Sequence, residues 1–220
     1  MKHEIQNFTF QNPTKILFGR NRIEDIDNEI PKDAKVLVLY GGGSVKKNGA
    51  FDRAVKALGE REWDEFSGIE ANPTFETLMK AVEKVRAGKF NYLLAIGGGS
   101  VIDGTKFVSA ASLFTEDPVD LFGWGVGKGL PVQEVVPFGT ILTLPATGSE
   151  MNSGAVITLV EKKAKVSFRG PKTFPVFSVL EPELTYTLPV RQLVNGLLDT
   201  FIHVMENYLT YPVGALLQDR

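Results

Sequence analysis

Tyr92-Leu93-Leu94-Ala95-Ile96-Gly97-Gly98-Gly99-Ser100 is the stretch of sequence that decides the fold. Five apolar residues run directly into three glycines and a serine, and residues 101–113 then follow a helix-like pattern. A continuous apolar run of this length is typical of a strand that is buried on both faces of a sheet. The stretch therefore predicts a buried strand, a tight glycine turn and a helix, in that order.

The same unit occurs earlier in the chain. Residues 36–40 form an apolar run that ends at Gly41-Gly42-Gly43, and residues 51–58 then alternate at helical spacing. Between the two units, residues 75–87 form an amphipathic helical pattern. Buried strands that alternate with helices indicate an α/β fold with a Rossmann-like parallel sheet.

Further strands are expected after a loop rich in glycine and proline at residues 115–137. Residues 140–145 predict a third buried strand, and residues 177–180 predict a short last one. Between them, two apolar segments flank the charged Glu161-Lys162-Lys163 and predict a hairpin formed by residues 155–160 and 164–168.

The character of the chain changes near residue 189. Residues 191–209 have helical periodicity, which Tyr211-Pro212 interrupts. We therefore expect a dinucleotide-binding α/β domain at residues 1–188, followed at residues 189–220 by the first helical segment of an all-α domain.

The amino-acid composition indicates which kinds of molecule the protein binds. The chain has 24 Lys and Arg against 26 Asp and Glu, so no strong field attracts nucleic acid or an anionic membrane. Cysteine is absent, which excludes disulfides and thiolate chemistry. The amino terminus lacks the pattern of a signal peptide, and no apolar run reaches the roughly 20 residues of a membrane span. We expect a soluble, cytoplasmic protein that binds a small molecule.

The second glycine turn is a candidate pyrophosphate site. Residues without Cβ atoms let the backbone approach a phosphate, and the start of the following helix attracts its charge. Gly98, Gly99 and Ser100 would supply this contact, and Asp103 lies close enough to contribute or to cap the helix. The pattern is not the GxGxxG fingerprint, and the alternative is a tight turn without a ligand.

The first glycine turn bears on the choice of nucleotide. Sites that select NAD often hold the ribose with a carboxylate at a strand end, and that acid would repel a 2′-phosphate. Here the turn contains Gly42, Gly43 and Ser44, followed by Lys46 and Lys47. The missing acid favours NADP(H), although the lysines also fit a solvated helix start.

Polar residues gather around the end of the third predicted strand. Hydroxyl and amide groups at such a place donate to phosphate or ribose, or else they cap a turn. The candidates are Thr143, Thr147, Ser149 and Asn152. Lys165 in the predicted hairpin is either a cofactor contact or a surface charge.

Asp199 and His203 are four residues apart in the last helical segment and therefore share one face. Together they are candidate ligands for one metal ion. An ordinary intrahelical salt bridge has the same spacing and is favoured by the residues taken alone. His3 is expected to be a surface residue.

Three motifs, in this order, resemble the iron-containing (group III) alcohol dehydrogenases. They are Gly97-Gly98-Gly99-Ser100-Val101-Ile102-Asp103, Leu144-Pro145-Ala146-Thr147-Gly148-Ser149-Glu150-Met151-Asn152 and Asp199-Thr200-Phe201-Ile202-His203. Within the family, Asn12-Pro13-Thr14-Lys15-Ile16-Leu17-Phe18-Gly19 and Tyr40-Gly41-Gly42-Gly43-Ser44 resemble the branch of NADPH-dependent aldehyde reductases and butanol dehydrogenases.

The resemblance implies hydride transfer between NADP(H) and an alcohol or aldehyde, with iron or zinc polarising the substrate oxygen. It also implies that the glycine turns hold the pyrophosphate and the adenosine ribose with its 2′-phosphate. The other candidates, Thr143, Thr147, Ser149, Asn152 and Lys165, would line the rest of the cofactor, and Asp199 and His203 would be two metal ligands.

The family holds its metal with one Asp and three His, and the segments with the other two histidines are not in this sequence. We therefore expect the 220-residue chain to bind metal weakly and to have negligible turnover by itself. Apolar Leu193, Leu197, Phe201 and Leu209 on the last helix predict oligomerisation or poor solubility, and we expect a homo-oligomer.

Two alternatives remain. The chain could be a non-catalytic nucleotide-binding or assembly module, or belong to a related family such as the glycerol dehydrogenases or dehydroquinate synthase. The run from Pro145 to Asn152 favours the alcohol dehydrogenases.

Overall fold

The computed structural model describes residue 7 and residues 9–209. The chain divides into two compact units, one of which is Pro13–Thr187, and the other includes Leu188 and the described residues that follow it. The predicted helix break at Tyr211-Pro212 and the predicted surface position of His3 lie outside the described residues.

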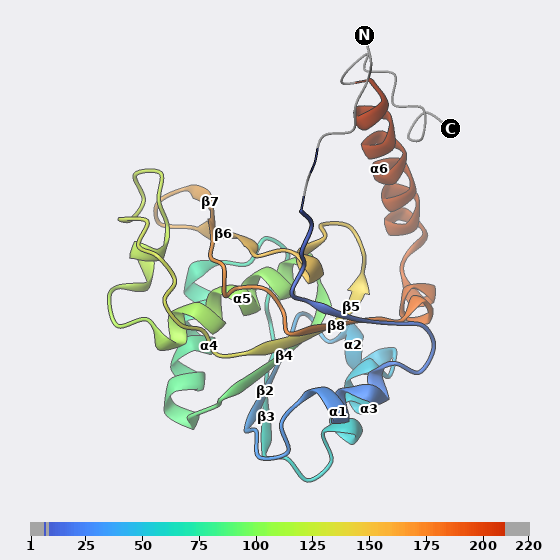
Figure 1. Ribbon diagram of the computed structural model, residues 1–220, viewed down its shortest axis with the longest axis horizontal. Coiled ribbons are helices and arrows are strands. Elements are labelled where there is room, and N and C mark those ends of the chain that lie inside the picture. Colours follow the sequence, from blue (N-terminus) through green and yellow to red (C-terminus); the bar gives the residue numbers. More distant parts are fainter. Residues whose placement is uncertain (1–6, 8, 210–220) are drawn as a thin grey trace. The chain divides into compact units, whose positions relative to one another are not determined.

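The first unit is built on a six-stranded sheet in which all pairs are parallel, in the order β1-β8-β5-β4-β2-β3 (Figure 1). The strands of this sheet are β1 (Lys15–Phe18), β2 (Val36–Tyr40), β3 (Trp63–Phe66), β4 (Tyr92–Gly98), β5 (Phe138–Leu144) and β8 (Phe177–Leu180). A separate antiparallel hairpin consists of β6 (Gly154–Leu159) and β7 (Ala164–Arg169). The expected Rossmann-like parallel sheet is confirmed.

Helices cover both faces of the sheet. The α-helices of this unit are α1 (Ile26–Glu29), α2 (Ser44–Lys47), α3 (Ala50–Leu58), α4 (Phe75–Gly88) and α5 (Gly99–Leu113). The 3-10 helices are η1 (Ile23–Asp25), η2 (Pro118–Leu121), η3 (Ser149–Met151) and η4 (Pro182–Thr187). Because side chains alternate along a strand, Leu37 and Leu39 of β2 pack in the cluster that includes α4 and α5, whereas Val36 and Val38 pack with α1 and α3.

An aromatic cluster fastens the hairpin to the helical layer. Phe107 of α5 stacks on Phe122 with ring centroids 5.5 Å apart, and Phe168 of β7 meets both rings edge-on. Such ring pairs contribute roughly 1 kcal/mol each beyond the burial of their apolar area. The contact of β6 with α5 places the hairpin beside the amino-terminal half of this helix (Figure 1).

Two strands of the sheet were not predicted from the sequence. They are β1 and β3, which form its two edges. Their side chains are mostly exposed or half-buried, so neither has the continuous apolar run of a central strand. The strands, the hairpin and the helices that were predicted for this unit all occur, with bounds that differ from the expected ones by at most two residues.

The second unit contains α6 (Val190–Leu209), which is the helix expected at residues 191–209. Among the described residues, none of the helices combines the length and the apolar character needed to cross a bilayer.

Candidate functional site

The strand order places a topological switch point between β2 and β4. From β2 the chain moves to β3 on one side, then returns to β4 on the other side of β2 and continues outward to β5. In sheets of this type the loops at the carboxyl ends diverge at the switch point, and ligands bind there. The two glycine turns that follow β2 and β4 are the loops at this point.

Close contacts explain the glycines where β4 meets α5. A Cβ atom on Gly97 would lie 2.6 Å from a methyl carbon of Val101, and one on Gly99 would lie 2.3 Å from Oγ1 of Thr147. Neither distance is tolerable for an alanine unless the neighbour moves. The second contact also brings the segment after β5 against the glycine turn, so Gly99 and Thr147, both predicted as site residues, lie together.

The first turn of α5 is suited to an anion. The helix has 15 residues, its N-cap is Gly98, no side chain caps it and its first turn contains no acid. Its leading N–H groups therefore remain available to a ligand. The Ser100 hydroxyl accepts a hydrogen bond from the Asn72 backbone N–H at 3.3 Å.

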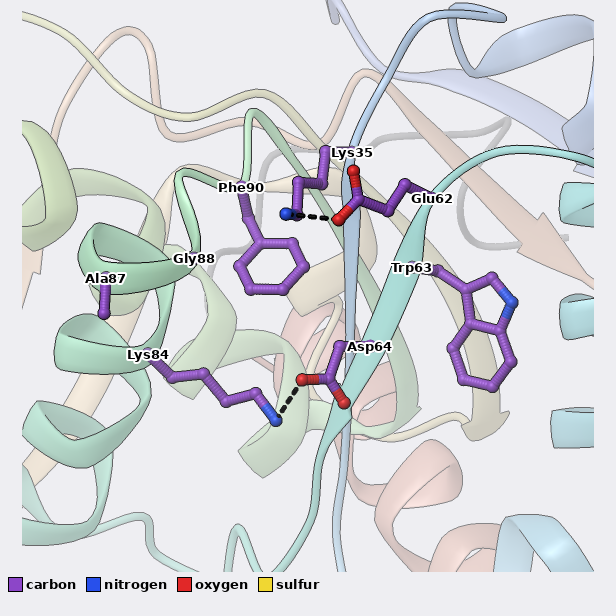
Figure 2. Close-up of a pocket in the computed structure, with 8 residues that line it drawn as sticks. All are labelled: Lys35, Glu62, Trp63, Asp64, Lys84, Ala87, Gly88 and Phe90. Carbon is purple, nitrogen blue, oxygen red and sulfur yellow. Dashed lines mark ion pairs between the residues drawn. The ribbon is translucent and has the colours of Figure 1, made fainter.

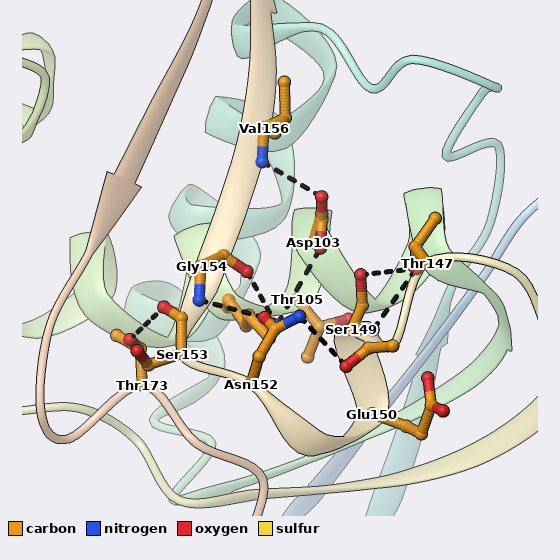
Figure 3. A network of polar contacts seen from close by, with 12 residues as sticks. Asp103, Thr105, Thr147, Ser149, Glu150, Asn152, Ser153, Gly154, Val156 and Thr173 are labelled. Carbon is orange, nitrogen blue, oxygen red and sulfur yellow. Dashed lines mark hydrogen bonds and ion pairs between the residues drawn. The ribbon is translucent and has the colours of Figure 1, made fainter. Parts of the chain in front are cut away.

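Asp103 does not cap α5, although the sequence allowed that role. Its Oδ2 instead accepts a hydrogen bond from the Val156 backbone N–H at 3.0 Å, which ties α5 to β6 (Figure 3). Its Oδ1 is buried and has no hydrogen-bond partner among the described residues. Burial raises the pKa of Asp103, while the Val156 N–H, the Ser149 hydroxyl and the charge of Lys106 oppose that rise.

The turn after β2 is open. Gly43 has a φ of 90°, which only glycine adopts readily, and no heavy atom would lie within 4 Å of a Cβ atom on Gly42 or Gly43. Ser44 begins α2 directly after this turn. There is room for a ligand to approach the backbone here.

Lys46 is less free than the sequence suggested. Its Nζ lies 2.7 Å from a carboxylate oxygen of Glu65 and 4.5 Å from the ring centroid of Phe51. The hydrogen bond to Glu65 raises the pKa of Lys46. Glu65 therefore brings a carboxylate close to the glycine turn after β2, where the sequence indicated no acid. The sequence did not reveal this acid, because Glu65 lies on β3, one of the two strands that were not predicted.

The polar residues after β5 form a connected network around η3 (Figure 3). Thr147 and Ser149 share a hydrogen bond between hydroxyls at 2.7 Å, and the Asn152 amide donates to the Gly148 carbonyl at 2.9 Å. Thr143 lies near the end of β5 and is half-buried. These contacts fold the segment back on itself.

Lys165 joins the same region through a residue that sequence reasoning missed. Its Nζ donates to Oδ1 of Asn72 at 2.7 Å, and the Asn72 N–H donates to Ser100. Asn72 has a φ of 56° and lies in the loop before α4. The predicted Ser100 and Lys165 thus belong to one network, which Asn72 completes.

Lys106 was also missed. Its side chain is fully buried, and its Nζ donates to Oδ1 of Asn152 at 2.8 Å and to the Gly154 carbonyl at 2.7 Å. Desolvation by burial lowers the pKa of Lys106 to about 8. The available signal was a lysine one turn after Asp103, inside a helix whose neighbours are otherwise apolar or small.

Asp199 and His203 share one face of α6 as expected, with Oδ2 of the aspartate 3.5 Å from Nε2 of the histidine. The other ring nitrogen lies 3.5 Å from Glu206. All three side chains are more than half exposed. Across residue 7 and residues 9–209, no group of three or more His, Cys, Asp or Glu side chains is placed so that it could hold a metal ion, so the described donor set does not make a complete metal centre.

A hollow of about 480 Å³ lies elsewhere, at the amino-terminal ends of β2 and β3 (Figure 2). It is lined by Lys35, Glu62, Trp63, Asp64, Lys84, Ala87, Gly88 and Phe90. Its charges neutralise one another, since Lys35 pairs with Glu62, and Lys84 pairs with Asp64. It is at the opposite edge of the sheet from the glycine turns and contains none of the predicted site residues.

Known proteins share both the sequence and the fold. The chain is 50% identical over 218 residues to the NADPH-dependent aldehyde reductase YqhD of Escherichia coli K12, covering 98% of this chain and 56% of that protein. It is 42% identical to the probable NADH-dependent butanol dehydrogenase 1 of Bacillus subtilis, again covering 98% of this chain and 56% of the relative. The chain thus spans about half the length of these relatives.

Solved structures agree. The crystal structure of NADH-dependent butanol dehydrogenase A from Thermotoga maritima superposes with a TM-score of 0.84 at 40% identity, covering 93% of this chain and 51% of that one. The substrate- and cofactor-free form of YqhD gives a TM-score of 0.87 at 47% identity, covering 98% and 55%. The family description "iron-containing alcohol dehydrogenase" matches residues 13–182. The chain therefore belongs to the iron-containing alcohol dehydrogenase family.

Proposed function

We propose that this chain is the NADP(H)-binding part of an alcohol dehydrogenase or aldehyde reductase. In this proposal residues 1–188 are the dinucleotide-binding domain, and residues 189–220 begin the helical metal-binding domain. The observation that carries it is the pair of glycine turns at the switch point between β2 and β4, next to the uncapped start of α5. The similarity to an NADPH-dependent aldehyde reductase and the match to the iron-containing alcohol dehydrogenase family support hydride transfer to an aldehyde or from an alcohol as the reaction class.

Each part of the site has a role in this proposal. Gly98, Gly99 and Ser100 hold the pyrophosphate, because they form the start of α5, where no side chain caps the leading N–H groups. Gly42, Gly43 and Ser44 face the adenosine ribose and its 2′-phosphate. The remaining contacts are Asp103, Thr143, Thr147, Ser149, Asn152 and Lys165. When bound, NADP(H) supplies or accepts the hydride.

Asp103 fits the site through its position. Its carboxylate ties α5 to β6 through the Val156 N–H, and its buried Oδ1 lies 3.9 Å from the Lys106 ammonium.

The preference for the phosphorylated nucleotide rests on the residues at the end of β2. The names of the relatives point in both directions, because YqhD is NADPH-dependent and the butanol dehydrogenases are NADH-dependent. In this chain the glycine turn itself contains no acid, and the nearby Glu65 is neutralised by Lys46. A 2′-phosphate would therefore meet little repulsion.

The described residues do not fit a complete metal site, so we assign no reaction step to a metal. Asp199 and His203 are proposed as two ligands of an iron or zinc ion. Because a structural or catalytic ion needs at least three protein ligands, we expect weak metal binding and negligible turnover from the 220-residue chain. Because too few metal ligands are present among the described residues, the second candidate function of this chain by itself is nucleotide binding without catalysis.

Titration of the purified chain with NADPH and NADH tests the proposal. We expect saturable NADPH binding at least about tenfold tighter than NADH binding, which corresponds to about 1.4 kcal/mol. Gly99→Ala should weaken NADPH binding by about tenfold or more, because its Cβ atom would displace Thr147.

Gly196→Ala is the matched control, since nothing lies within 4 Å of a Cβ atom at that helical position. It should leave nucleotide affinity unchanged. If neither nucleotide binds, the proposal fails and only an assembly role remains. Equal affinity of the wild-type chain and Gly99→Ala for NADPH would remove the second glycine turn from the site.

A further inference from the structure

Lys106 is a fully buried cation that the proposed function leaves without a role. It lies in the second turn of α5, and its ammonium reaches Asn152, in the segment that joins β5 to β6, and Gly154 at the start of β6. Two of its three ammonium protons are engaged, by Oδ1 of Asn152 at 2.8 Å and by the Gly154 carbonyl at 2.7 Å. Both acceptors lie beyond η3, so the lysine links α5 to the start of β6.

Asn152 is the residue through which this link acts. Besides the ammonium, its Oδ1 accepts the Gly154 N–H at 3.0 Å, and its Nδ2 donates to the Gly148 carbonyl at 2.9 Å. One side-chain amide thus closes the loop from Gly148 to Gly154. The loop contains Ser149 and follows Thr147, which touches the Gly99 turn.

The charges around Lys106 explain why a cation is retained there. Asp103 on the same helix has Oδ1 at 3.9 Å from Nζ, and the charge of Glu150 on η3 also acts on the ammonium. Burying a charged lysine is unfavourable unless its partners are held in place. An apolar side chain of the same length would fill the space without orienting Asn152.

We propose that Lys106 is a positioning residue for NADP(H) binding, which acts through Asn152 to hold residues 147–152 against the glycine turn of α5. It does not touch the cofactor in this proposal. The inference rests on the proposed function for its link to the nucleotide. The clamp itself, from α5 to Asn152 and Gly154, is independent of any ligand.

A double-mutant cycle on NADPH affinity tests the link. Lys106→Met removes the donors and keeps an apolar side chain of similar length, and Asn152→Ala removes the acceptor. We expect each change to weaken NADPH binding by about tenfold. If both act through one clamp, the double variant loses about tenfold as well, whereas independent roles would multiply to about a hundredfold. A multiplied loss would overturn the proposal.

Ser109→Ala is the matched control from the same helix. The buried Ser109 hydroxyl donates to the Val136 carbonyl, which lies outside residues 147–154. Its loss should lower the free energy of unfolding without changing the NADPH dissociation constant. An equal loss of NADPH affinity in Ser109→Ala would show that Lys106→Met acts only through general destabilisation, which also overturns the proposal.

Hydrogen exchange separates the clamp from the nucleotide. In the chain without ligand, Lys106→Met should speed amide exchange in residues 148–156 by about tenfold, with no comparable change in β2 or β4. Unchanged exchange in residues 148–156 would overturn the clamp whether or not NADPH binds. Failure of the wild-type chain to bind NADPH, with the exchange effect present, would instead overturn the proposed function and the clamp's link to it.

Discussion

Asp103 and Lys106 lie one turn apart on α5, and burial moves the pKa of each toward that of the other. Desolvation raises the pKa of Asp103 and lowers the pKa of Lys106 to about 8. Both shifts have the same origin, since a buried environment disfavours the charged form. Because about 8 is still above neutral pH, Lys106 remains mostly protonated at pH 7.

The shift at Lys106 predicts how stability depends on pH. The folded pKa of about 8 lies below the ordinary 10.5, so between these values the unfolded chain binds more protons. Stability rises with pH wherever the unfolded state binds more protons. The penalty for burying the charge is therefore fully present below pH 8 and is lost as pH rises toward 10.5.

Urea unfolding of the wild-type chain and Lys106→Met at pH 7 and pH 10 measures this effect. We expect the difference between their free energies of unfolding to move by about 2 kcal/mol in favour of the wild-type chain at the higher pH. Lys106→Met is the reference because methionine does not titrate. A difference that is the same at both pH values would contradict the lowered pKa.

Lys46 leads to a prediction about selectivity between NADPH and NADH. Its removal leaves the carboxylate of Glu65 without a counter-charge near the glycine turn after β2, where the 2′-phosphate is proposed to bind. Lys46→Ala should therefore weaken NADPH binding by about tenfold and NADH binding much less. The exposed Lys47 is the control, and Lys47→Ala should have the smaller effect. Equal losses for the two nucleotides in Lys46→Ala would show that Lys46 does not act on the phosphate.

At the scale of elements, Arg53 connects α3 to the end of β8. Its guanidinium makes two hydrogen bonds, at 2.8 and 3.1 Å, with the carboxylate of Glu181, whose side chain is fully buried. The same carboxylate accepts the Arg22 backbone N–H, at the start of η1. Three elements from distant parts of the sequence therefore meet at one buried acid.

Replacement of Arg53 should be strongly destabilising. Arg53→Met leaves the Glu181 carboxylate buried without its cation, and breaking such a pair typically costs about 3–5 kcal/mol. Urea unfolding at pH 7 checks this value. Arg20→Met is the control, because the Arg20 side chain is 76% exposed in its pair with Glu183. We expect a loss below about 1 kcal/mol there, and similar losses in both variants would contradict the buried network.

The elements also show what could be predicted locally. Strands β2, β4 and β5 are buried on both faces, so each carries an apolar run that identifies it by itself. The edge strands β1 and β3 contain charged and half-buried residues and carry no such run. Their pairing depends on the neighbouring strand, which local sequence does not reveal.

At the scale of the molecule, α6 has no buried side chains, and its apolar residues remain exposed. Leu197 and Phe201, four residues apart on one face, are 72% and 60% exposed. A large exposed apolar strip favours association. We therefore expect the 220-residue chain to sediment as a dimer or larger species.

The double change Leu197→Glu and Phe201→Glu should increase the monomer fraction in sedimentation velocity. It should leave NADPH affinity unchanged, because the proposed nucleotide contacts lie in Pro13–Thr187. Trp124→Glu is the control, since Trp124 is 89% exposed but lies outside α6. A monomer at every concentration of the wild-type chain would remove the expectation of a homo-oligomer.

The sequence by itself determined the fold class, the central strands, the two glycine turns and the spacing of Asp199 and His203. These features are local, because a buried strand, a glycine turn and a helix face each leave a periodic or compositional pattern within a few residues. The same patterns also identified most residues of the proposed nucleotide site.

Only the tertiary structure decided which of these residues meet. It brought Glu65 against Lys46, Asn72 between Ser100 and Lys165, and Lys106 beneath Asn152. It also turned Asp103 away from the helix cap toward β6. These contacts join residues from different elements, and their energies depend on burial and on distances in space, which separation along the chain does not encode.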